Sequence, residues 1–168
     1  IMHASYSKGW WDDSTACVNA SGAKNPMYDD VTTVNREIHA VGTDYLKYRN
    51  TGVSVCGDLS SAHSRVRVQL ERQALRPNEA NLDAIAQVTS DAAILAGTFR
   101  GEQDSRALLL VNTQNPWNPA ASADVRLQPQ AEFVILHQGE RKEAFLVPAD
   151  GLTLHLESGE WAFVELVR

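Results

Sequence analysis

The chain has 168 residues, of which 43% are hydrophobic and 21% charged, and its formal net charge is −6. This composition is that of a soluble globular protein and excludes collagen-like, coiled-coil and disordered chains. At about 100–200 residues per domain, the length fits one domain or one domain with an appendage. The 15 basic residues are scattered, which argues against a nucleic-acid partner. No apolar run reaches the ~18 residues of a membrane span, so we expect no membrane-spanning or targeting segment in this chain.

The first residues have the pattern of a protein interior. The pattern of residues 1–6 predicts a short buried strand. The polar residues 7–24 then indicate a long loop, which contains the adjacent Trp10 and Trp11. Long loops in compact domains are usually functional. Since Ile1 precedes Met2, we expect the chain to be a piece of a longer polypeptide.

Helix signals follow the loop. Asn25 is a good N-cap, Pro26 suits the first helical position, and Asp29 places negative charge in the first turn. Gly42 is expected to end or interrupt the helix, with one further turn over residues 43–48. The apolar positions follow a spacing of three and four, which predicts one buried helix face: Met27, Val31, Val34, Ile38, Val41 and Tyr45.

The pattern changes after Asn50-Thr51-Gly52, which predicts a turn and a domain boundary. Short alternating segments separated by turn residues then indicate an antiparallel β-sandwich or barrel. We therefore predict a mainly β protein, with a strand-loop-helix segment over residues 1–52 and an antiparallel β-sandwich over residues 53–168. The predicted strands cover residues 53–56, 65–70, 84–88, 92–99, 107–112, 123–127, 132–136, 152–156 and 161–167.

The residues that could bind metals or react are few. Cys17 and Cys56 cannot form a disulfide framework or a zinc cage. One bridge between them is possible, but we expect two free thiols. The five histidines show no metal-ligand spacing, and no phosphate-binding loop or nucleophile motif is present. We therefore predict no metal site and no cofactor.

One strand, one loop and one helix cannot bury their own surfaces, because the helix needs a sheet beneath it and the strand needs parallel neighbours. The residues of this segment resemble the last β/α unit of a glycoside hydrolase (β/α)8 barrel, or TIM barrel. The resemblance is carried by Asn25-Pro26-Met27-Tyr28-Asp29-Asp30-Val31 and Val34-Asn35-Arg36-Glu37-Ile38. The β-sandwich that trails such barrels is similar to the later segments Ala107-Leu108-Leu109-Leu110-Val111-Asn112 and Leu154-His155-Leu156-Glu157-Ser158-Gly159-Glu160-Trp161-Ala162.

The resemblance implies that this chain is the C-terminal part of a glycoside hydrolase, with a carbohydrate substrate and the rest of the barrel as partners. The two catalytic carboxylates of such barrels would follow the fourth and seventh strands, upstream of Ile1. We therefore predict no catalytic residue in this chain. Asp12 and Asp13 could also be considered a pair, but neighbouring carboxylates in a loop more often interact with solvent or a cation.

The loop after the last strand of a barrel reaches the active site. Trp10 or Trp11 could stack on a pyranose ring there, or fill space beneath the loop. Asp12 could bind a sugar hydroxyl, and Tyr6 and Lys8 are further substrate-binding candidates. Trp117, between two prolines, is expected to be a packing residue, and Phe133 is expected to lie in the core of the sandwich.

Two alternatives remain open. The chain could be a non-catalytic carbohydrate-binding module, or a structural or interaction domain whose helix docks on another subunit. The predicted helix favours the glycoside hydrolase interpretation over the binding module, because a carbohydrate-binding module does not need the final helix of a barrel.

Overall fold

The computed structural model describes residues 16–72, 82, 85–115, 117–118 and 121–167, and of residues 70–72 only the backbone. The chain divides into two compact units, residues 1–42 and 43–168. The described part of the first unit holds a short turn region closed by a bridge between Val18 and Lys24, followed by most of one helix. The second unit is mainly β.

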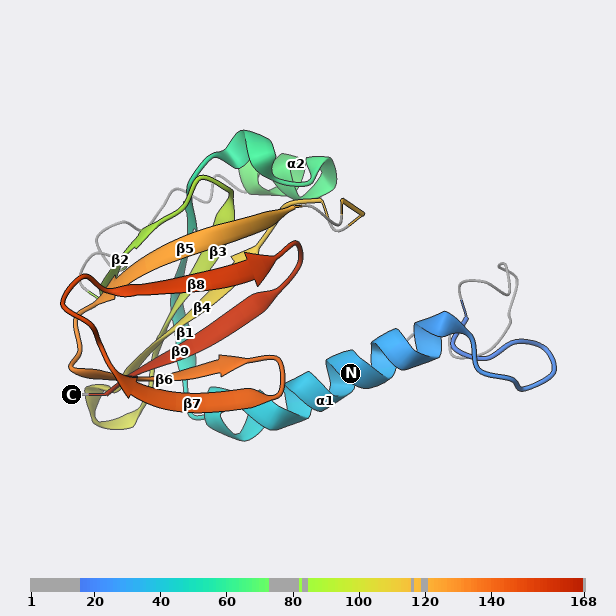
Figure 1. Ribbon diagram of the computed structural model, residues 1–168, viewed down its shortest axis with the longest axis horizontal. Helices are drawn as coiled ribbons and strands as arrows, with labels where there is room; N and C mark the ends of the chain where they lie inside the picture. Colours follow the sequence, from blue (N-terminus) through green and yellow to red (C-terminus); the bar gives the residue numbers. More distant parts are fainter. Residues whose placement is uncertain (1–15, 73–81, 83–84, 116, 119–120, 168) are drawn as a thin grey trace. The chain divides into compact units, whose positions relative to one another are not determined.

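Regular structure covers most of the described residues (Figure 1). The helices are α1 (Pro26–Tyr45) and α2 (Ser64–Arg72), with short 3-10 turns at Leu59–Ser61 and Glu102–Asp104. The strands are β1 (Arg49–Cys56), β2 (Ala86–Thr89), β3 (Ile94–Arg100), β4 (Arg106–Asn112), β5 (Ser122–Pro129), β6 (Phe133–Gln138), β7 (Arg141–Leu146), β8 (Leu152–Glu157) and β9 (Trp161–Val167).

The strands form two antiparallel sheets, as the sequence predicts. The described residues place six strands in the order β1-β3-β4-β9-β6-β7 and three in the order β2-β5-β8. One hydrophobic core joins side chains of both sheets, including Leu108 and Leu110 from the large sheet and Val125 and Leu156 from the small one. The arrangement is consistent with a β-sandwich, because each sheet buries one face against the other.

Alternating hydrophobicity explains most of the strands. In β5, Ala123, Val125 and Leu127 are buried while the residues between them are exposed. This alternation places apolar side chains on the core face and polar ones in solvent. The strand predicted over residues 161–167 is confirmed with the same bounds, and β3, β4, β5, β6 and β8 each match a predicted strand to within a few residues.

Two predicted elements are corrected by the structure. Residues 65–70 form part of helix α2, not a strand. Val66, Val68 and Leu70 alternate with polar residues, but arginine and glutamine between them are good helix formers and the alternation is too short to decide. Strand β7 was not predicted, because its charged residues Arg141, Lys142 and Glu143 hide any alternation.

The turn predicted at Asn50-Thr51-Gly52 is absent. These residues belong to β1, which pairs with β3 and has a register shift between Asn50 and Gly52. The boundary predicted at residue 52 therefore falls inside a strand, and the compact strand-rich unit starts earlier, at Thr43. The register shift beside Gly52 is an irregularity of the kind that a β-bulge produces. Glycine inside a strand often marks such a position.

Helix α1 is confirmed, and Gly42 does not end it. The backbone carbonyl of Asn25 accepts the first bond, from the amide of Tyr28 at 2.8 Å. The predicted apolar stripe is buried only in part: Val41 is buried, and Val31 and Tyr45 are half-buried. Met27, Val34 and Ile38 remain 39%, 47% and 39% exposed. No helix in the described part of the chain is long and apolar enough to cross a membrane.

Two predicted packing residues are exposed. Trp117 is 76% exposed, so it fills no core space. Its ring lies beside that of His63, with the two centroids 5.5 Å apart. Phe133 is 44% exposed although β6 was predicted to bury it. The strand predicted over residues 1–6 and the tryptophans of the following loop lie outside the described residues.

The division of the chain leads to a first prediction. A truncated chain covering residues 43–168 should unfold cooperatively with nearly the melting temperature of the full chain, because it keeps the whole of β1. A chain covering residues 53–168 should be less stable, because it loses the first half of β1 and the aromatic side chains of Tyr45 and Tyr48. Each aromatic ring removed from a buried contact costs about 1.5–3 kcal/mol. Thermal melts followed by circular dichroism measure the difference, and equal melting temperatures would contradict the boundary at Thr43.

Candidate functional site

The strand that organises the site is β9, which lies in the interior of the large sheet. Ala162, Val164 and Leu166 belong to the core between the sheets. Because successive side chains of a strand point to opposite faces, Phe163 and Glu165 lie on the other face of the large sheet. We call this the outer face. Both residues are nevertheless buried, with Phe163 0% and Glu165 7% exposed.

Neighbouring elements bring other polar groups to the outer face. In β6, His137 pairs with Phe163 of β9 and is 2% exposed. In β7, Lys142 pairs with His137. Asp44 comes from the last turn of α1, within the strand-rich unit. Two strands, one edge strand and one helix end therefore converge on a single point.

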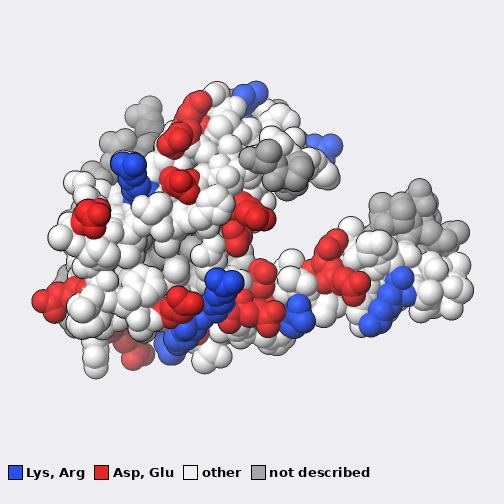
Figure 2. Space-filling model, viewed as in Figure 1, with Lys and Arg blue, Asp and Glu red and all other residues white. Residues whose placement is uncertain are grey.

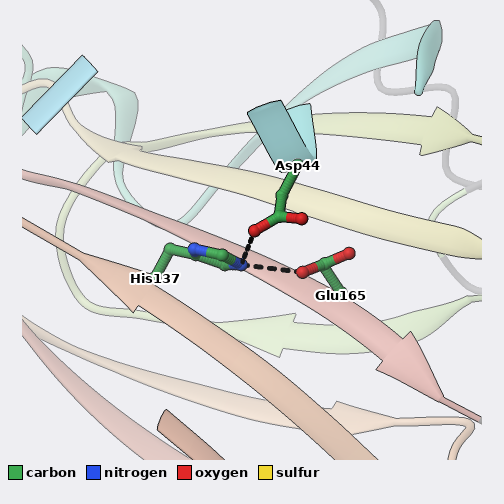
Figure 3. Close-up of side chains that lie close together, drawn as sticks. All are labelled: Asp44, His137 and Glu165. Atoms are coloured by element: carbon green, nitrogen blue, oxygen red, sulfur yellow. Dashed lines mark hydrogen bonds and ion pairs between the residues drawn. The ribbon is translucent and has the colours of Figure 1, made fainter. Parts of the chain in front are cut away.

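Three side chains meet there (Figure 3). The Nε2 atom of His137 lies 2.7 Å from Oε1 of Glu165 and 3.9 Å from Oδ2 of Asp44. One potential ligand atom from each of the three residues lies within 4.8 Å of the others. We call Asp44, His137, Glu165 and the side chains bonded to them, Tyr48, Lys47 and Lys142, the outer-face cluster.

The remaining carboxylate oxygens of the cluster have partners as well. The hydroxyl of Tyr48 donates to Oε2 of Glu165 at 2.9 Å. The ammonium of Lys47 donates to Oδ1 of Asp44 at 2.6 Å, and that of Lys142 donates to Oδ2. Each of the four carboxylate oxygens thus accepts at least one hydrogen bond, which is what burial of such groups requires.

Aromatic rings surround the cluster. The ring of Tyr45 lies 5.4 Å from that of Phe99 and 5.6 Å from that of Phe163, in edge-to-face geometry. The ring of Tyr48 lies 5.6 Å from that of Phe163. Such pairs contribute about 0.5–1.5 kcal/mol each beyond the area they bury. They hold the last turn of α1 against the outer face together with the polar contacts.

The charges of the cluster change its acid-base behaviour. Hydrogen bonds from Lys142 and Lys47 lower the pKa of Asp44 from 3.8 to about 2, against the opposing effect of burial. Burial, reinforced by the contact with Glu165, raises the pKa of Tyr48 to about 12. The hydrogen bond with Asp44 raises the pKa of Lys47. At neutral pH the Asp44 carboxylate is therefore charged and the Tyr48 hydroxyl neutral.

Asp44, His137 and Glu165 are ligand types that bind transition metals. The hydrogen bonds of the cluster argue against a metal centre. The ammonium groups of Lys47 and Lys142 already donate to both oxygens of Asp44, and the hydroxyl of Tyr48 already donates to Glu165. A divalent cation would have to displace the lysine ammonium groups from Asp44. The arrangement is suited to joining a helix end to a sheet through paired charges, in which the carboxylates are largely buried and the lysine side chains remain half-exposed or more.

The structure does not bring the sequence-predicted site residues into this cluster. Tyr6, Trp10, Trp11 and Asp12 lie outside the described residues, so their role as sugar-binding residues stays a prediction. Neither Cys17 nor Cys56 forms a disulfide.

The outer-face cluster itself was not predicted, because its members are far apart in the sequence. One signal could have indicated it: Glu165 is a charged residue inside the otherwise apolar strand β9.

Figure 2 shows acidic and basic side chains intermixed on the face of the molecule that it presents.

A pocket of about 300 Å³ opens beside the outer-face cluster. Its lining includes Tyr48 and Glu165 of the cluster and residues Gln103 and Asp104 of the turn between β3 and β4. Its volume is at the lower end of the roughly 300–1,000 Å³ typical of ligand sites.

Comparison with known proteins adds no relative, since no family model, no curated protein and no solved structure matches this chain.

The lowered pKa of Asp44 leads to a second prediction. Because the folded state favours the charged carboxylate, Asp44 stabilises the fold above its ordinary pKa of 3.8, and this contribution is lost as the pH falls towards about 2. Asp44→Asn should therefore lower the melting temperature at pH 7 and flatten the loss of stability between pH 4 and pH 2. Asp150→Asn, at an exposed turn, is the matched control and should change neither. An unaltered acid branch in Asp44→Asn would contradict the role of the cluster.

Proposed function

We propose that this chain is the C-terminal part of a glycoside hydrolase that acts on carbohydrate. Residues 1–42 and the end of α1 supply the last β/α unit of the barrel, and the β-sandwich braces that barrel. The catalytic carboxylates lie upstream in the parent polypeptide, by which we mean the product of the same gene from its start through Arg168. The loop with Trp10, Trp11 and Asp12 reaches the sugar site, with Tyr6 at the end of the preceding strand.

The observation that carries the proposal is the exposed part of the apolar stripe of α1. Met27, Val34 and Ile38 recur at helical spacing and are each exposed by more than a third. An amphipathic helix normally buries its apolar stripe against another element. A sheet of earlier β/α units, lying under the stripe, would cover it in the parent polypeptide.

The outer-face cluster supports the bracing role. It ties the last turn of α1 to β9 and β6 through Asp44, Glu165 and His137. The aromatic contacts of Tyr45 with Phe99 and Phe163 strengthen the same junction. In this proposal, the helix that belongs to the barrel continues directly into the sandwich.

A third prediction tests this proposal. Ile38→Asp should change the stability of the 168-residue chain by no more than about 0.5 kcal/mol, because the position is exposed. The same substitution should destabilise the parent polypeptide by about 1–3 kcal/mol, because it would bury a carboxylate. His39→Asp, at an exposed position on the polar side of α1, is the control and should be neutral in both. Denaturant unfolding measures the change in stability for both variants in both polypeptides.

Activity assays complete this test. The parent polypeptide should hydrolyse at least one member of a panel of aryl glycosides, and the 168-residue chain should hydrolyse none. A gene that encodes no β/α units upstream would overturn the proposal. So would turnover by the chain alone that Asp12→Asn or Asp13→Asn abolishes.

One observation favours a second function, that of a carbohydrate-binding module. Trp117 is 76% exposed beside His63, and an exposed tryptophan ring can stack on a sugar. As a fourth prediction, this function requires the chain to be retarded in gels containing a soluble polysaccharide, and Trp117→Ala to abolish the retardation. Val68→Ala, another exposed apolar position, is the matched control. Equal migration with and without polysaccharide would exclude this function for the polysaccharides tested.

A further inference from the structure

An exposed apolar row crosses three strands of the large sheet. Phe133 of β6 pairs with Leu146 of β7 on one side and with Val167 of β9 on the other. Leu146 is 65%, Phe133 44% and Val167 39% exposed. Directly opposite residues in an antiparallel sheet have neighbouring side chains, so the three form one continuous surface. We call it the outer-face row.

The row lies on the same face as the outer-face cluster. Phe133 and His137 are four residues apart in β6, and Val167 and Glu165 two residues apart in β9, so each pair points to the same side of the sheet. The next row of this face, Ala144, Ile135 and Glu165, lies between the outer-face row and His137. The last turn of α1 therefore covers one part of the outer face and leaves the apolar part beside it exposed.

We propose that the outer-face row is the surface on which the β-sandwich docks against the helical layer of the barrel in the parent polypeptide. This inference rests on the function proposed above. The exposed residues of the stripe lie on α1, and the last turn of α1 lies on the outer face. The barrel that would cover the stripe is therefore connected through α1 to this face of the sheet. Tethering of this kind gives a high effective concentration, at which a small apolar surface suffices for docking.

A second copy of the chain is the competing occupant, and β7 argues against its pairing edge to edge with this sheet. This strand is at the edge of the large sheet, and it carries Arg141, Lys142 and Glu143 at exposed positions. Charges along an edge strand oppose strand-to-strand pairing between copies. The apolar row is continuous with the surface that already receives α1, which favours the tethered barrel.

Hydroxyl-radical footprinting of the 168-residue chain and of the parent polypeptide tests the docking surface. Leu146 and Phe133 should be modified readily in the chain. In the parent polypeptide their modification should fall at least about fivefold, as the centre of an interface excludes water. Val68, 38% exposed on α2, should react equally in both. The double variant Phe133→Lys/Leu146→Lys should keep the melting temperature of the chain and lower that of the parent polypeptide, whereas Val68→Lys should lower neither.

The outcomes separate this inference from the proposed function. If Ile38 becomes protected in an active parent polypeptide while Phe133 and Leu146 stay reactive, the docking surface is overturned and the proposed function stands. If Ile38 also stays reactive, both fail. If light scattering shows the 168-residue chain to be a dimer that Phe133→Lys/Leu146→Lys dissociates, the row belongs to a second copy and the inference is overturned.

Discussion

The buried carboxylate of Glu165 is the constraint on which the junction of helix and sheet depends. It lies in the middle of the large sheet, and both its oxygens are bonded, one to His137 and the other to Tyr48. A buried charge without such partners would cost several kcal/mol. The sheet must therefore keep β6 in register beside β9, and the segment after α1 must return across the outer face to deliver Tyr48. Asp44 adds the second charge and is itself held by two lysines.

The large sheet consequently uses both its faces. Its inner face shares one core with the small sheet, where Leu110 and Val164 are among the buried residues. Its outer face buries Phe163 under two tyrosines and ends in an exposed apolar row. A sandwich domain that stood alone would need a solvent-facing polar surface there. An apolar outer face that receives a helix end suits a domain that supports a larger neighbour, as the glycoside hydrolase proposal requires.

Periodicity was a reliable guide wherever each side chain faces either core or solvent, as in β5 and β9. It failed for α2, where Val66, Val68 and Leu70 alternate over too few residues to distinguish a strand from a helix. It missed β7, which lies at a sheet edge and is mostly exposed, so no core imposes alternation on it. It also assigned Phe133 to the core, because a pattern of alternation cannot tell which of two sheet faces is covered.

The sequence by itself determined helix α1, most of the strands, the mainly β character and the antiparallel pairing, because caps, turn residues and short-range alternation are local properties. Only the tertiary structure decided that β1 begins before Gly52, that part of the stripe of α1 stays exposed, and that Asp44, His137 and Glu165 meet. Those three residues are separated by long stretches of chain, and their approach depends on the strand order β9-β6-β7 and on where α1 ends. Strand order is set by the packing of the whole sheet, which no local pattern records.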